Sequence, residues 1–170
     1  MSALVVASVV ASVVEPVVEP VVVPAVVPLY VLDTNVWLDW LVFSHDAVPM
    51  LQALQAAGEI DIIYTAEMLE ELADVLSRAQ FKLSSEQQVT ALSCMRAAAR
   101  EVPAKTPMCS VRCADKDDQV FIDTALTYQV SWLLSKDNHL LSLRGRAAKH
   151  HVRVSTLDAW LAQSPSVLCV

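Results

Sequence analysis

The stretch that follows Pro28 alternates between short apolar runs and longer segments with helical spacing. Apolar runs that predict strands cover residues 29–32, 59–65, 130–135 and 151–156, and a further short strand is expected near Val102. Helical spacing covers residues 47–57, 66–78, 85–100, 116–128 and 157–163, with Gly58 closing the first of these, while residues 36–40 open a helix or turn. Strands separated by helices predict an α/β fold with a mostly parallel central sheet flanked by helices.

The first 28 residues differ in composition from the rest of the 170-residue chain, because they are almost all Val, Ala, Pro and Ser. Glu and Pro residues at 15–16 and 19–20 cut the apolar run well short of the roughly 20 residues that span a bilayer. No Lys or Arg precedes the run, as a secretory signal would require. We therefore expect residues 1–28 to be a disordered low-complexity extension, residues 29–163 to form one domain with a sizeable core, and residues 164–170 to be a tail.

Cysteine spacing argues against a zinc site. The four cysteines, at positions 94, 109, 113 and 169, include no CxxC pair and no His at zinc-ligand spacing. Cys109 and Cys113 could bind a metal or form a disulfide, but two further ligands would be missing. We expect ordinary reduced thiols in a cytoplasmic protein.

The formal net charge of −7 is unfavourable for a nucleic-acid partner, whose phosphates attract basic surfaces. The distribution of charge weakens this objection. All 12 Lys and Arg residues lie after residue 77, and several cluster within residues 143–153. If some of the acids hold divalent cations, the remaining surface is close to neutral with one basic stretch, so nucleic acid is not excluded.

Two expected strands end on an acidic residue. Asp33 follows the first strand and Asp137 follows the strand at residues 130–135. Ligands of parallel α/β sheets bind outside the carboxyl ends of the strands. Asp33 could instead cap the helix that follows it, but a second acid at a strand end makes capping a less satisfactory explanation.

Helical periodicity selects further acids. Glu71 lies at the edge of the apolar face of the helix at 66–78, where a surface ion pair is an equal alternative. Asp118 lies on the buried stripe of the helix at 116–128, and Asp115, just before that helix, can turn to the same side. Asp115 or Asp117 could simply be a cap. An unpaired carboxylate at position 118 would be costly, and neither Arg112 nor Lys116 lies on its stripe.

A metal site accounts for these acids together. The set consists of Asp33, Glu71, Asp118 and Asp137. Ligation by oxygen alone suits hard divalent ions, chiefly Mg²⁺ or Mn²⁺, and does not suit zinc. The sequence therefore predicts that Asp33 stands at its strand end to hold a metal ion.

The motifs VLDTNVWLDWL, EMLEELADVLSRAQF and DKDDQVFIDTALTYQVSWLLSKDNHLL, in this order, resemble those of the PIN-domain ribonucleases. The resemblance is greatest to the toxin components of bacterial toxin–antitoxin systems and covers about residues 29–160. It implies a three-layer α/β/α fold and a cytoplasmic Mg²⁺- or Mn²⁺-dependent endoribonuclease, which cleaves RNA phosphodiester bonds by metal-activated water. A cognate antitoxin and a second copy of the chain, as a homodimer, are the partners implied, with no membrane.

Position by position, the resemblance implies which residues carry the chemistry. The catalytic residues implied are Asp33, Glu71, Asp118 and Asp137, and the metal ligands implied are these four with Asp115. Asn35 matches the amide of the family's D-x-N motif and would orient Asp33 or the waters of the metal.

The chain departs from the family before its last acid, where Thr-Gly is usual and Ser135 and Lys136 stand here. Ser135 still supplies a hydroxyl. Lys136 alters the local turn and could contact RNA phosphate, as could Arg144 and Arg146, although a solvated lysine is the simpler alternative.

Three other functions compete with this interpretation. A PIN-like module could bind RNA or protein without cleavage, but all four acids are in place. A receiver-type phospho-acceptor domain would have adjacent acids on an early strand, and only Asp33 stands there. A metal-dependent phosphatase or flap-nuclease relative is a third possibility, and the chain is too short for the additions of a flap nuclease.

Overall fold

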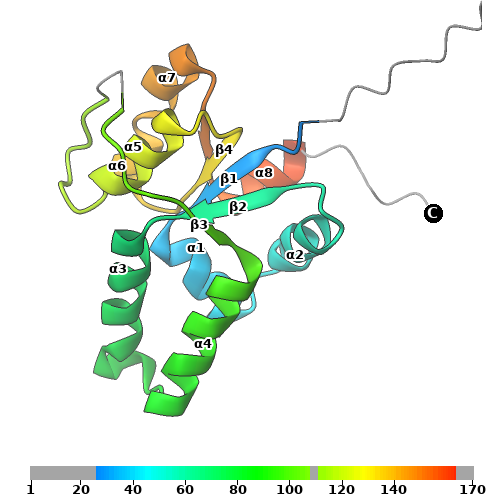
Figure 1. Ribbon diagram of the computed structural model, residues 1–170, viewed down its shortest axis with the longest axis vertical. Helices are drawn as coiled ribbons and strands as arrows, with labels where there is room; N and C mark the ends of the chain where they lie inside the picture. The colour runs from blue at the N-terminus through cyan, green and yellow to red at the C-terminus, as the bar shows by residue number, and fades with distance from the viewer. Residues whose placement is uncertain (1–25, 108–110, 164–170) are drawn as a thin grey trace, which may run out of the picture.

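The computed structural model describes residues 26–107 and 111–163, and its centre is a parallel sheet of five strands in the order β3-β2-β1-β4-β5. The strands are β1 (Leu29–Leu32), β2 (Asp61–Tyr64), β3 (Arg100–Glu101), β4 (Trp132–Leu134) and β5 (Arg153–Ser155). Helices lie on both sides of the sheet (Figure 1). The predicted α/β fold is therefore confirmed, and the sheet is parallel throughout the described residues.

The connections between strands are helical. The longer helices are α2 (Val48–Ala56), α3 (Ala66–Ser77), α4 (Ser85–Ala98), α5 (Gln119–Thr127) and α8 (Leu157–Gln163). The shorter ones are α1 (Thr34–Leu38), the π-helical turn η1 (Asp39–Phe43), η2 (Ala79–Phe81), α6 (Asn138–Leu141), α7 (Arg144–Ala147) and η3 (Ala148–His150). Helices α3 and α4 lie side by side and project from the sheet (Figure 1).

Local signals in the sequence account for several helix ends. Gly58 follows α2 with φ of +71°, a left-handed conformation that glycine adopts without steric cost. Ser84 and Gln87 form a capping box at the start of α4. The central strands β1 and β4 are apolar along most of their length, as expected for strands covered by helices on both faces.

The order of the strands changes direction at β1, and the region outside the carboxyl ends of β1 and β4 is here termed the crevice. The chain passes from β1 to β2 and β3 on one side of the sheet, and returns to add β4 and β5 on the other side. Leu32 of β1 is in register with Leu134 of β4. The residues that follow these two strands therefore meet at a topological switch point, where open α/β sheets bind their ligands.

The structure differs from the sequence prediction in detail. Helix α5 begins at Gln119, three residues later than expected, and residues 138–150 form short helices that the sequence did not predict. Cys94 and Cys113 are free thiols, as expected. Cys109, Cys169, residues 1–25 of the predicted extension and the predicted tail lie outside the described residues. No helix in the described part of the chain is both long and apolar enough to cross a membrane.

Candidate active site

Asp33 stands at the carboxyl end of β1, with only 3% of its surface exposed. Its side chain makes no capping hydrogen bond to α1. Instead Oδ2 accepts hydrogen bonds from the Ser135 hydroxyl at 2.5 Å and from Asn35 Nδ2 at 2.6 Å. The capping alternative therefore fails for Asp33, and the carboxylate is oriented by the two residues expected to support it.

Ser135 connects the ends of two strands. It follows β4, is fully buried, and accepts a hydrogen bond from the backbone N–H of Asp137 at 2.8 Å while donating its own proton to Asp33. The Asp137 carboxylate accepts from the backbone N–H of His139 at 2.6 Å and so caps α6. One hydroxyl thus fixes Asp33 and the loop that carries Asp137 relative to each other.

Glu71 reaches the same region from α3. Its Oε1 accepts a hydrogen bond at 2.8 Å from the hydroxyl of Thr34, the residue after Asp33. The side chain is half-buried rather than paired with a surface base. The hydrogen bond between Thr34 and Glu71 therefore links α3 to the start of α1, at the carboxyl end of β1.

Asp118 lies at the N-terminus of α5, in the capping position, and does not lie within the buried stripe predicted from helical periodicity. The difference arises because residues 115–118 form a bend followed by a turn, and the helix starts only at Gln119. Asp118 is nevertheless half-buried. Burial, and next the negative charges of Asp137, Asp33 and Asp115, raise the pKa of Asp118 to about 6.

Two further carboxyl groups, those of Asp33 and Glu71, also have raised pKa values. Burial raises the pKa of Asp33 to about 6, against the opposing effect of the Ser135 hydrogen bond. Burial also raises the pKa of Glu71, opposed by the Thr34 hydrogen bond and reinforced by the charge of Asp118. These carboxylates repel one another across the crevice, so the fold gathers negative charge there without neutralising it.

The donor set fits a hard divalent cation. The five candidate ligands are all carboxylates. Three of them have a raised pKa, which a neighbouring cation would lower. Among residues 26–107 and 111–163, no three His, Cys, Asp or Glu side chains already converge to the spacing of a metal site. A bound cation would attract each of these carboxylates. Asp115 is exposed and accepts a hydrogen bond from the N–H of Asp117.

Lys136 and Asp39 form an ion pair that the sequence did not predict. Asp39 begins η1 and is 4% exposed. The backbone N–H of Lys136 also donates to Asn35 Oδ1 at 3.0 Å. A signal for this pair existed in the sequence, because Asp39 interrupts the apolar run at residues 36–42 and an acid in such a run requires a partner.

Arg144 and Arg146 lie on α7 and are both exposed. Arg144 Nε donates to the carbonyl of Leu141, at the end of the helix that Asp137 caps. The arginines therefore belong to the segment that follows Asp137, and Arg144 lines a hollow with Trp132 and Arg153. Their contact with RNA, and that of Lys136, stays a prediction.

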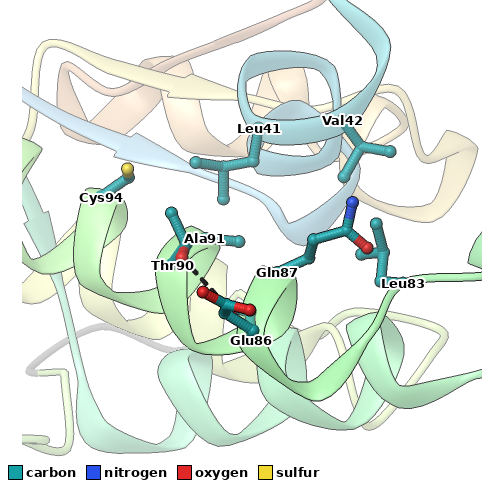
Figure 2. Close-up of a pocket in the computed structure, with 8 residues that line it drawn as sticks. All are labelled: Leu41, Val42, Leu83, Glu86, Gln87, Thr90, Ala91 and Cys94. Carbon is teal, nitrogen blue, oxygen red and sulfur yellow. Dashed lines mark hydrogen bonds between the residues drawn. The ribbon is translucent and has the colours of Figure 1, made fainter.

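One surface hollow lies beside α3 and another beside α4. The hollow beside α3 has a volume of about 460 Å³ and includes Glu71. Its other lining residues are Glu67, Lys116, Asp117, Gln119, Val120 and Asp123. The other hollow, of about 360 Å³, lies between η1 and α4, with Leu41 and Val42 facing Ala91 and Gln87 (Figure 2). The first includes the predicted site residue Glu71, whereas the second holds none of the predicted site residues.

Comparison with known proteins bears on both the fold and the family. A family model described as PIN domain matches residues 29–139. The chain is similar to a chain in the crystal structure of VapBC2 from Rickettsia felis bound to a DNA fragment from their promoter, with a TM-score of 0.53 and 13% sequence identity. This similarity covers 75% of the present chain and 98% of the Rickettsia chain, and at that identity it supports the fold alone. The comparison with curated proteins gave no match.

Proposed function

The chain belongs to the PIN-domain family, and on that basis we propose that it is a divalent-metal-dependent endoribonuclease, the toxin of a toxin–antitoxin pair. The observation that carries the proposal is the set of carboxylates at the switch point beside β1. Asp33 and Asp118 come from separate elements and both have a pKa of about 6. Perturbed carboxyls gathered in one crevice are typical of catalytic sites.

In this proposal the chain's own residues form and orient the site. Asp33, Glu71, Asp118 and Asp137, with Asp115, would hold Mg²⁺ or Mn²⁺. The cation, when bound, supplies Lewis-acid activation of the phosphodiester and of the attacking water. Ser135 and Asn35 fix the Asp33 carboxylate, and the Thr34 hydroxyl fixes Glu71, so these oxygens are oriented before substrate arrives.

An antitoxin partner and an RNA substrate belong to the same proposal. The family resemblance in the sequence is to toxin components, and the VapBC2 chain from Rickettsia felis shares the fold. We propose a cytoplasmic protein whose acidic crevice is blocked by the cognate antitoxin. Arg144 and Arg146 would contact the RNA backbone next to the crevice.

A non-catalytic PIN-like binding module is the alternative function. A binding module would not need buried carboxylates that repel one another, because such groups lower the stability of the fold. The proposed enzyme would need them.

Cleavage of a mixed RNA pool tests the proposal. Purified protein would be incubated with Mg²⁺, with Mn²⁺ and with EDTA, beside Asp118→Asn and the control Asp74→Asn. Asp74 is exposed and forms an ion pair with Arg78 at 2.9 Å, so its replacement removes an acid outside the crevice. We expect metal-dependent cleavage by the wild type and the control, and a loss of at least about a hundredfold in Asp118→Asn.

Other results would contradict the proposal in different ways. Cleavage that persists in EDTA would exclude a metal-dependent mechanism. Folded protein that binds Mn²⁺ but leaves all RNA intact would favour the binding module.

A further inference from the structure

Lys136 brings a positive charge into the loop that carries the last catalytic acid. It stands between Ser135, which orients Asp33, and Asp137 itself. An ammonium group free to move in this loop could pair with the carboxylates of the crevice. It would then offset the negative charge that a divalent cation requires.

The structure holds this ammonium elsewhere. Lys136 Nζ forms an ion pair with Oδ2 of Asp39, whose side chain is only 5% exposed, whereas that of Lys136 is 41% exposed. Apart from this ion pair, no hydrogen-bond donor within residues 26–107 and 111–163 reaches the buried oxygen. The ammonium therefore supplies the compensating charge that a buried carboxylate needs.

Backbone contacts make the arrangement specific. The Lys136 N–H donates to Asn35 Oδ1 at 3.0 Å, while the amide of the same Asn35 donates to Asp33. Main chain and side chain of Lys136 are thus both held by the segment made of α1 and η1.

We propose that Asp39 is a positioning residue that withdraws the charge of Lys136 from the catalytic carboxylates and so preserves the cation site. This inference rests on the proposed function, because it assigns Asp39 a role in the same metal site. Asp39 does not bind the cation in this scheme. It acts through Lys136.

Mn²⁺ binding to the wild type and to five variants, measured by calorimetry near neutral pH, tests the inference without requiring RNA cleavage. Asp39→Asn releases the ammonium, and we expect Mn²⁺ affinity to fall by about tenfold or more, the size of effect that a nearby opposite charge has on carboxylate protonation. Asp39→Asn with Lys136→Gln removes both charges, and affinity should return to within about twofold of the wild type.

Asp61→Asn is the matched control. It removes a carboxylate that pairs with Arg100 at 2.6 Å, where β2 begins, at the opposite end of the strands from the crevice. Its affinity should equal that of the wild type. Lys136→Gln alone should lower the melting temperature, because Asp39 loses its partner, but should keep Mn²⁺ affinity within about twofold.

Several outcomes overturn the inference. If folded Asp39→Asn binds Mn²⁺ with wild-type affinity, the ion pair between Lys136 and Asp39 has only a structural role. A double variant as weak as Asp39→Asn would show that Asp39 matters for a reason other than the lysine charge. If Asp39→Asn does not fold, a loss of Mn²⁺ affinity of about tenfold in Lys136→Gln would still contradict the inference.

Asp118→Asn separates this inference from the proposed function. If Asp118→Asn binds Mn²⁺ as the wild type does, or the wild type binds none, the metal site itself is wrong and the proposed function fails. If Asp118→Asn loses binding while Asp39→Asn retains it, only the role of Asp39 fails.

Discussion

At the scale of single residues, the site is organised by one hydroxyl. Ser135 donates to Asp33 and accepts from the N–H of Asp137, so it couples the ends of β1 and β4. The sequence placed Ser135 where the family has threonine and therefore suggested that a hydroxyl was retained. That the hydroxyl contacts both acids follows from the register of β1 and β4, which the sequence does not specify.

Ser135→Ala tests this coupling. The Asp33 carboxylate would lose a donor that lowers its pKa, so that pKa should rise above about 6. We expect ribonuclease activity to fall by about tenfold to a hundredfold, since positioning is lost while the ligands remain. Ser142→Ala is the control, because its hydroxyl donates to the His139 carbonyl and to neither acid. Equal activity in the two variants would contradict the role of Ser135.

The raised pKa values of Asp33 and Asp118 predict how stability depends on pH. Both lie near 6 in the folded protein against an ordinary value of 3.8, so the fold favours the protonated carboxyls. This stabilisation is complete below about pH 4 and is lost as pH rises through about 6. Metal-free protein should therefore become more stable as pH falls from about 7 to about 5, relative to a variant that lacks one of these groups.

Urea unfolding in EDTA measures this effect. Asp118→Asn removes one repelling charge, so at pH 7 it should be more stable than the wild type by about 0.5–1 kcal/mol, a value discounted because Asp118 is only half-buried. The difference should shrink towards pH 5. A variant less stable than the wild type at pH 7 would contradict the repulsion among these carboxylates.

At the scale of elements, short-range signals determined the helices that end on capping residues. Gly58 after α2 and Ser84 with Gln87 before α4 mark boundaries that the structure reproduces within a few residues. The helices at residues 138–150 were missed because each is about one turn long and lacks a full apolar period. Asp118 was misplaced for a related reason, since periodicity cannot locate a helix start to within three residues.

A pair of glycine variants tests the element boundaries. Gly58→Ala should lower the free energy of unfolding by about 1–2 kcal/mol, because a Cβ strains backbone at φ of +71° although the space around it is open. Gly145→Ala, within α7 and also in open space, should instead raise it by about 0.5–1 kcal/mol. Urea unfolding of both variants measures the sign of each change in the free energy of unfolding. A stabilised Gly58→Ala would contradict the left-handed C-terminal end of α2.

At the scale of the whole molecule, charge is distributed unevenly. The chain carries a net charge of −7, and its crevice is acidic, yet the exposed arginines of α7 lie in the segment that follows Asp137. We propose that an RNA strand bound at the crevice also contacts these arginines. Net charge alone would have argued against nucleic acid.

Salt dependence tests this distribution. Arg144→Ala with Arg146→Ala should weaken RNA binding and reduce the slope of log affinity against log salt by about 1–2, one for each phosphate that an arginine no longer neutralises. Arg78→Ala is the control, because Arg78 is paired with Asp74 on α3. Filter binding with Asp118→Asn protein avoids cleavage during the measurement. An unchanged slope in the double variant would exclude binding of RNA phosphate by α7.

The sequence by itself determined the α/β fold class and the family, and it predicted which acids form the metal site. These follow from hydrophobic periodicity and from the order of short motifs, which are local properties of the chain. It also indicated that Asp33 did not stand at its strand end merely as a cap.

Only the tertiary structure decided which side chains contact one another. The hydroxyls of Thr34 and Ser135 reach Glu71 and Asp33, and Lys136 pairs with Asp39, through contacts between residues 37 to 102 positions apart in the sequence. Such contacts depend on the order β3-β2-β1-β4-β5 and on strand register. No local pattern encodes them, because each is set by how distant elements pack.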